Sequence, residues 1–193
     1  LGMHVYHDIH RMFPAGCVST DNFVSGFASV LPYLDSGPLY DEYDFELYYT
    51  DPYNQAVSEQ KITTYLCPSM TLPRDVPDRS CGETGAPSSY LLSEGSDDYM
   101  KKGDGVFNLV WPKYGYNNHP VRIRDIKDGT TNTIAIGETT YDMWDYKWSS
   151  RSPCAGQPKH GTARWVVGYP KVALGTTLKP FNLHEAAGNG GFQ

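Results

Sequence analysis

The sequence has 193 residues, a mass of 21.6 kDa and a formal net charge of −6 at pH 7. Because this length suits one domain with its own core, we expect a single domain over residues 1–193. The acidic balance argues against a nucleic-acid partner, which needs clustered Lys and Arg, and no apolar run reaches the roughly 20 residues that span a bilayer.

The composition indicates a loop-rich domain with an aromatic core. Hydrophobic residues make up 39% of the chain and the mean hydropathy is −0.49, while 15 Tyr and 4 Trp supply large apolar side chains with a polar end. The 14 Pro and 19 Gly predict many turns and irregular connections.

The first half of the chain predicts short helices separated by turns. Residues 1–12 have the spacing of a helix, which Pro14 would end. A helix is also favoured over residues 23–34, and helical periodicity returns over residues 54–68. Residues 68–89, which are rich in Pro, predict a loop.

The second half predicts strands, so the expected fold class is α+β. Residues 88–94, 105–111 and 162–170 are short apolar runs of the kind that form strands. Between the last two, an Asp-Gly turn leads into a strand that would place Ile134 and Ile136 on one half-buried face.

The four cysteines predict disulfide bonds in an oxidising compartment. Cys17, Cys67, Cys81 and Cys154 are even in number and lack the Cys-x-x-Cys spacing of zinc and redox motifs. Three pairings are open to them. We favour Cys67 with Cys81, because a Pro-rich loop lies between them, and consequently Cys17 with Cys154. The alternative is four free, buried thiols in a cytosolic protein.

Four separated motifs resemble those of a known family. They are LGMHVYHDIHRMFPAG, VLPYLDSGPLYDEYDF, TTYLCPS and VRIRDIKDGTTNTIAIGE, in that order within residues 1–138. Together they resemble the large pilin-like family of planctomycetes, which is catalogued as a domain of unknown function and also labelled a bacterial solute-binding family. Its members look like type II secretion pseudopilins, with a prepilin-type leader and a long hydrophobic N-terminal helix before the head.

The resemblance implies a pilin-like head in which the end of that helix packs on an antiparallel sheet with long loop insertions. The hydrophobic helix is expected before Leu1, and the family's closing segment after the Gly-rich end of this chain. The implied function is non-enzymatic assembly and protein-partner binding at the periplasmic or outer surface, with membrane contact only through the N-terminal helix. The solute-binding label implies an alternative, a periplasmic or surface module for a carbohydrate or another solute.

Three histidines recur every third residue in the first helix. On a helix His4 and His7 lie about 60° apart and share a face, whereas His10 lies farther round. The pair has the spacing of a metal chelate. We favour packing or hydrogen bonding where the helix meets the head, because His pairs at this spacing are common without a metal.

Two acidic segments contain the oxygen ligands that Ca²⁺ prefers. Asp125, Asp128 and Asn132 surround an Asp-Gly turn, and DEYDFE supplies the carboxylates of residues 41–46. Neither has the spacing of an EF-hand loop, and turn capping by the aspartates is favoured. We therefore expect no resident cofactor, with Ca²⁺, which pseudopilins often hold, as the one ion to consider.

The acidic stretch is also rich in tyrosine. Tyr40, Tyr43, Tyr48 and Tyr49 would suit a surface that stacks carbohydrate or docks a protein, although we expect most of them to fill the core. The chain has no Gly-x-Ser-x-Gly, His-Glu-x-x-His or P-loop motif, so we expect no enzymatic activity. A metal-dependent hydrolase that uses some of the six histidines is the least favoured function.

Overall fold

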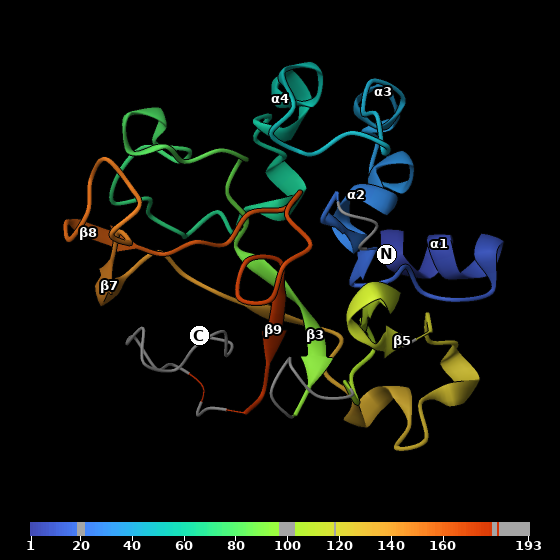
Figure 1. The fold of residues 1–193 in the computed structure, drawn as a ribbon. Helices are drawn as coiled ribbons and strands as arrows, with labels where there is room; N and C mark the ends of the chain where they lie inside the picture. Colours follow the sequence, from blue (N-terminus) through green and yellow to red (C-terminus); the bar gives the residue numbers. More distant parts are fainter. Residues whose placement is uncertain (19–21, 97–102, 118, 179–180, 182–193) are drawn as a thin grey trace.

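The structure is a computed structural model that describes residues 1–18, 22–96, 103–117, 119–178 and 181. Within these residues, short helices and small sheets alternate along the chain, which confirms the α+β class (Figure 1). No helix in the described part is both long and apolar enough to cross a membrane. The Gly-rich end after Lys179 lies, apart from residue 181, outside the described residues.

The helix predicted at the start of the chain is confirmed as α1. It ends at His10, because the next residue, Arg11, has a left-handed φ of 61°, which stops the helix ahead of Pro14. Gly2 allows close packing, because a Cβ there would lie 2.7 Å from the side chain of Leu34. The helices are α1 (Gly2–His10), α2 (Gly26–Ser29), α3 (Gly37–Asp41) and α4 (Pro52–Ser58), and the 3-10 turns are η1 (Leu31–Tyr33), η2 (Thr63–Tyr65), η3 (Arg79–Cys81), η4 (Pro112–Tyr114), η5 (Ile123–Asp125) and η6 (Thr130–Asn132).

Strands form three sheets among the described residues. They are β1 (Cys17–Val18), β2 (Val24–Ser25), β3 (Tyr90–Gly95), β4 (Leu109–Trp111), β5 (Tyr116–Asn117), β6 (Ile136–Glu138), β7 (Met143–Lys147), β8 (Pro158–His160) and β9 (Leu174–Thr176). The sheet orders are β2-β1-β4-β5, β6-β3-β9 and β7-β8. Because β1 runs parallel to β4 and β3 parallel to β9, the two larger sheets are mixed rather than purely antiparallel.

The main core joins the first two sheets to the loops between them. Trp165, Phe107 and Leu92 are completely buried in it and come from three distant parts of the chain. A smaller cluster around Val76 and Tyr141 lies between the Pro-rich loop and the segment that leads into β7. Aromatic side chains thus fill much of the interior, as the composition predicts.

Several predicted elements are shorter than expected or absent. α4 ends at Ser58, so the helix expected as far as residue 68 is wrong beyond that point. Residues 23–34 form β2, the four-residue α2 and η1 instead of one helix. The strand expected over residues 162–170 is also wrong, since this segment makes only isolated bridges. In residues 23–34 and 162–170, runs of successive residues are buried. Their apolar side chains therefore do not alternate between a buried and an exposed face, and the sequence pattern cannot distinguish helix from strand.

Candidate functional site

Two adjoining hollows flank the first turn of α1. Their volumes are about 220 and 240 Å³, and both are lined by Leu1, Met3 and Ile136. One continues towards Leu34 and the other towards Phe13, and most of the lining side chains are apolar. We call the two hollows the α1 groove. A groove of this kind suits an apolar side chain or a small ligand.

An exposed apolar side chain lines both hollows of the α1 groove. Ile136 is 39% exposed, and Ile134, which lines neither hollow, is 43% exposed. The half-buried face expected for the two isoleucines is therefore wrong, because Ala135 and Gly137 are the more buried residues of this segment. β6 lies at the edge of its sheet, where one face of a strand can remain open to solvent.

The three histidines of α1 contact the rest of the domain. His7 Nε2 accepts a hydrogen bond from the Ile123 backbone N–H (3.2 Å), and its ring lies 4.9 Å from that of Phe13. His4 meets the same phenylalanine edge-on at 6.0 Å, and His10 Nε2 lies 2.9 Å from the tyrosine hydroxyl of η1. Among the described residues, no group of three or more His, Cys, Asp or Glu is arranged to hold a metal.

The residues considered for Ca²⁺ have local turn contacts. Asp125 Oδ2 accepts the Arg122 backbone N–H (3.1 Å), which closes η5. The Asn132 side-chain amide donates to the Asp128 carbonyl (3.0 Å) across the turn at Gly129. These are the contacts of turn-capping residues.

The tyrosines of the acidic stretch differ in exposure. Tyr43 is buried, and its burial raises the pKa of its hydroxyl well above the ordinary value. Tyr40 and Tyr49 are half-buried, whereas Tyr48 is 40% exposed. Tyr53, which follows in α4, is 63% exposed. Tyr48 and Tyr53 therefore face solvent.

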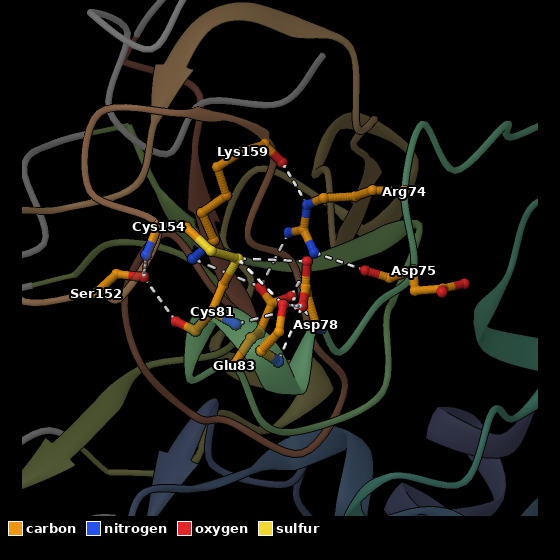
Figure 2. The surroundings of a disulfide bond; sticks show 9 residues. Arg74, Asp75, Asp78, Cys81, Glu83, Ser152, Cys154 and Lys159 are labelled. Atoms are coloured by element: carbon orange, nitrogen blue, oxygen red, sulfur yellow. Dashed lines mark hydrogen bonds and ion pairs between the residues drawn. A yellow bond between two sulfur atoms is a disulfide. The ribbon is translucent and has the colours of Figure 1, made fainter.

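Cys81 and Cys154 form a disulfide bond, so the expected pairings of Cys67 with Cys81 and of Cys17 with Cys154 are wrong (Figure 2). The two Cα atoms are 5.1 Å apart, although 73 residues separate them in sequence. Ser152 Oγ donates to the Cys81 carbonyl (2.6 Å) and accepts the Cys154 N–H (3.1 Å). These bonds tie η3 to the loop between β7 and β8.

The other two cysteines, Cys17 and Cys67, are free. Cys17 lies in β1 and is completely buried, which raises the pKa of its thiol well above the ordinary value. Cys67 is half-buried, and its N–H donates to Ser89 Oγ (2.8 Å) beside β3. The Pro-rich loop after Cys67 does not close on itself but carries Cys81 to the β7-β8 hairpin.

A buried carboxylate meets two cations beside the disulfide (Figure 2). The Glu83 side chain is completely buried, and Arg74 donates to both of its oxygens at 2.6 and 3.1 Å. Lys159 Nζ lies 3.5 Å from Oε1, and the Asp78 backbone N–H donates to Oε2 (3.1 Å). We call these residues the Glu83 network. It joins the Pro-rich loop and η3 to β8.

Burial and aromatic rings set the electrostatics of the Glu83 network. Lys159 Nζ and the Arg74 guanidinium lie 4.4 and 4.8 Å from the centre of the Trp148 ring. Burial, with the neighbouring Arg164 and Arg74, lowers the pKa of Lys159 to about 8. Burial raises the pKa of Glu83, but the hydrogen bond from Arg74 and the nearby cations outweigh it, so this pKa lies below its ordinary value.

Sequence reasoning missed the Glu83 network. Arg74 and Glu83 lie in the segment expected to be only a loop, and Lys159 lies far from them in sequence. The charged residues around Cys81 are the only sequence feature in this segment that hints at an ion-pair network. They point to Lys159 only when Cys81 is known to pair with Cys154. Because its donors and acceptors are used on one another, the network suits the task of holding η3 against β8.

A comparison with protein families matched residues 1–182 to the family described as a protein of unknown function (DUF1559), named SBP_bac_10. Comparisons with curated proteins and with solved structures found no match. The family match covers nearly the whole chain, including the α1 groove and the Glu83 network. The chain therefore belongs to the DUF1559 family, a family of unknown function that also carries a solute-binding label.

Proposed function

We propose that this domain is the non-enzymatic head of a pilin-like or pseudopilin-like protein, which acts by assembly and by binding protein partners. The observation that carries the proposal is the α1 groove, whose two apolar hollows share the exposed Ile136. On a chain with a mean hydropathy of −0.49, exposed apolar surface around a groove is typical of a contact site.

The proposal includes an apolar prepilin-type helix that leads into α1 and packs with those of neighbouring copies. The α1 groove would then receive apolar residues of the adjacent copy.

The disulfide supports a location in the periplasm or at the cell surface. Disulfides persist in oxidising compartments and are rare in the reducing cytosol. The bond between Cys81 and Cys154 closes a long stretch of chain and joins two segments that contain little regular structure. We therefore place the head on the outer side of the inner membrane, attached through the N-terminal helix.

The test compares two isoleucines in the full gene product, expressed in its own cells. Ile136 lines both hollows, whereas Ile134 has a similar exposure and lines neither. We expect Ile136→Asp to move the protein from the assembled to the monomeric fraction in sedimentation and cross-linking, and Ile134→Asp to behave as wild type. Wild-type assembly by both variants would contradict the role of the groove. A full gene product without a prepilin-type leader and apolar helix would contradict the pilin-like part.

The second candidate is a surface module that binds a solute. The groove favours it because hollows of about 220 and 240 Å³ fit a small molecule, and their lining suits an apolar solute better than a sugar. A thermal-shift screen with oligosaccharides and short-chain amphiphiles distinguishes the two. A stabilising ligand whose effect disappears in Ile136→Asp supports this candidate, whereas a screen without any shift removes it.

A further inference from the structure

Three aromatic side chains from distant parts of the chain meet around Phe23. The centre of its ring lies 4.9 Å from that of Trp111, 5.5 Å from that of Tyr169 and 5.7 Å from that of Tyr48. The interplanar angles are 86°, 65° and 73°, so each ring meets Phe23 edge to face. We call these residues the Phe23 cluster. None of them lines the α1 groove.

The Phe23 cluster is open to solvent. Tyr48 and Tyr169 are 40% and 44% exposed, and Phe23 and Trp111 are half-buried. A core cluster would bury such rings, as the domain does with Trp165 and Tyr141. Tyr and Trp are enriched at binding surfaces, where they supply a large contact area with few rotatable bonds.

The backbone holds Phe23 in an unfavourable conformation. Its φ of 52° lies in the left-handed region, which bulky residues rarely adopt and which stores strain. Hydrogen bonds on both sides maintain it: the Asn22 side chain donates to the Phe45 carbonyl (2.7 Å), and the Gly168 N–H donates to the Phe23 carbonyl (2.7 Å). Strain of this kind is concentrated at functional sites.

A buried amide fixes the loop that bears Tyr48. Asn54 in α4 is completely buried, and its Oδ1 accepts the Asp44 N–H (2.8 Å). Its Nδ2 donates to the carbonyls of Asp44, Leu47 and Tyr48 at 2.8, 3.3 and 3.2 Å. The loop is therefore held in one conformation before any partner arrives, which reduces the entropy lost on binding.

The segment that contains this loop is acidic. Residues 12–60 contain eight Asp or Glu and no Lys or Arg, which leaves the rest of the chain, with fourteen acidic and sixteen basic residues, at a net charge of +2. Two cations, Lys113 and Lys171, lie two residues from Trp111 and Tyr169 in the sequence, and both interact with other groups, as Tyr48 and Trp111 do. α3 and α4, which border the loop, lie at one edge of the molecule (Figure 1). Among the described residues of this part, the exposed acidic residues are Asp35, Asp41, Glu42 and Glu46, of which Glu46 lies two residues from Tyr48.

We propose that the Phe23 cluster, with the acidic segment that carries Tyr48, docks an arginine-containing basic segment of a partner protein. A guanidinium stacks on aromatic rings and pairs with carboxylates, and both groups are present here. Opposite charge draws the basic segment to this face, and the aromatic rings make the contact. The Phe23 cluster shares no residue with the α1 groove, so binding at the cluster can be tested independently of the proposed assembly.

The test uses the whole chain and a capped Arg-Gly-Gly-Arg peptide, with its citrulline analogue as a neutral peptide of the same shape. Binding is measured by calorimetry and by NMR shifts of backbone amides. We expect the arginine peptide to bind, to shift the amides around Phe23 and Tyr48, and to weaken as salt rises. Tyr48→Ala and Tyr169→Ala should each weaken binding about twofold to fivefold, whereas Tyr53→Ala, an exposed tyrosine outside the cluster, should not.

Several outcomes would overturn the proposal. If the citrulline peptide binds as tightly as the arginine peptide, the positive charge of the peptide does not contribute to binding. If Tyr48→Ala binds the arginine peptide as tightly as wild type does, the peptide binds at another site. Binding of cellohexaose without binding of the arginine peptide would make the cluster a carbohydrate platform. No binding of the arginine peptide to the folded wild-type chain at millimolar concentration would also reject it. Circular dichroism of each variant shows that a loss of binding is not a loss of fold.

Discussion

Replacing Glu83 by glutamine keeps the shape of the side chain and removes the carboxylate that Arg74 and Lys159 share. Both cations are largely buried, with 13% and 12% of their side chains exposed. Removing one partner of a buried ion pair typically costs about 3–5 kcal/mol. The glutamine oxygen can still accept one bond from Arg74, so we expect Glu83→Gln to lower the free energy of unfolding by about 3 kcal/mol at pH 7. For a chain of this length that corresponds to a fall of about 6–12 °C in Tm.

The same protein contains a matched control. Glu59 also pairs with an arginine, Arg79, but 58% of that arginine side chain is exposed. Exposed pairs contribute about 0–1 kcal/mol, so Glu59→Gln should change the stability little. Urea unfolding followed by tryptophan fluorescence measures both variants, because Trp148 packs directly on the cations of the Glu83 network. The denaturant slope should remain that of wild type.

The pH dependence sharpens this comparison. Above its pKa of about 8, Lys159 is neutral in the folded state and no longer needs the carboxylate. The difference between Glu83→Gln and wild type should therefore shrink between pH 7 and pH 9.5. A loss below about 1 kcal/mol at pH 7, or equal losses in Glu83→Gln and Glu59→Gln, would refute the view that this network holds η3 against β8.

Three further predictions concern the same part of the molecule and the free thiols. Reduction of the Cys81–Cys154 bond should lower the free energy of unfolding by about 4 kcal/mol in the chain-entropy account, as measured by urea unfolding with and without reductant, and a loss below about 1 kcal/mol would contradict it. Because the pKa of Lys159 falls from 10.5 to about 8 on folding, the unfolded chain binds more protons between these values, and stability should rise by about 2 kcal/mol from pH 7.5 to pH 9.5. Lys159→Met should lack this rise. A thiol reagent should label Cys67 in the folded protein and Cys17 only after unfolding, and equal labelling rates would be the contrary result.

The sequence predicted those elements whose local signals agree with their surroundings. The predicted N-terminal helix and the predicted strand at residues 88–94 correspond to α1 and β3. Both have a clear hydrophobic pattern and are bounded by Pro or Gly residues that end regular structure. The β7-β8 hairpin was not predicted. Its register shifts between Met143 and Lys147, and its strands are joined by a long loop, so the sequence lacks the short Gly- or Asn-containing turn that identifies a hairpin. The segment around Trp165 looks like a strand because it is apolar, yet it is buried as irregular chain.

The candidate sites were harder to predict, because they depend on contacts between distant segments. The tyrosines of the acidic stretch were visible, but nothing in the sequence indicates that Phe23 meets both Tyr48 and Tyr169. Likewise, the spacing of four cysteines cannot show that the Pro-rich loop carries Cys81 to Cys154. The spacing in the sequence favoured a disulfide between Cys67 and Cys81, which would close a short loop. The packing of the Pro-rich loop instead brings Cys81 next to Cys154.

Buried aromatic donors explain how a chain of low hydropathy folds with so little regular structure. Short strands and irregular segments leave buried carbonyls without ladder partners, and such a carbonyl costs about 1–3 kcal/mol if it stays unpaired. Tyr65 Oη donates to the Phe27 carbonyl (2.6 Å), and Trp165 Nε1 donates to the Gln60 carbonyl (3.0 Å). The completely buried Tyr141 donates to a backbone carbonyl in the same way. Each of these side chains fills apolar volume in the core and also donates a hydrogen bond to a buried loop carbonyl. Tyrosine and tryptophan therefore do the work of aliphatic core residues and of the hydrogen bonds that strand pairing would otherwise supply.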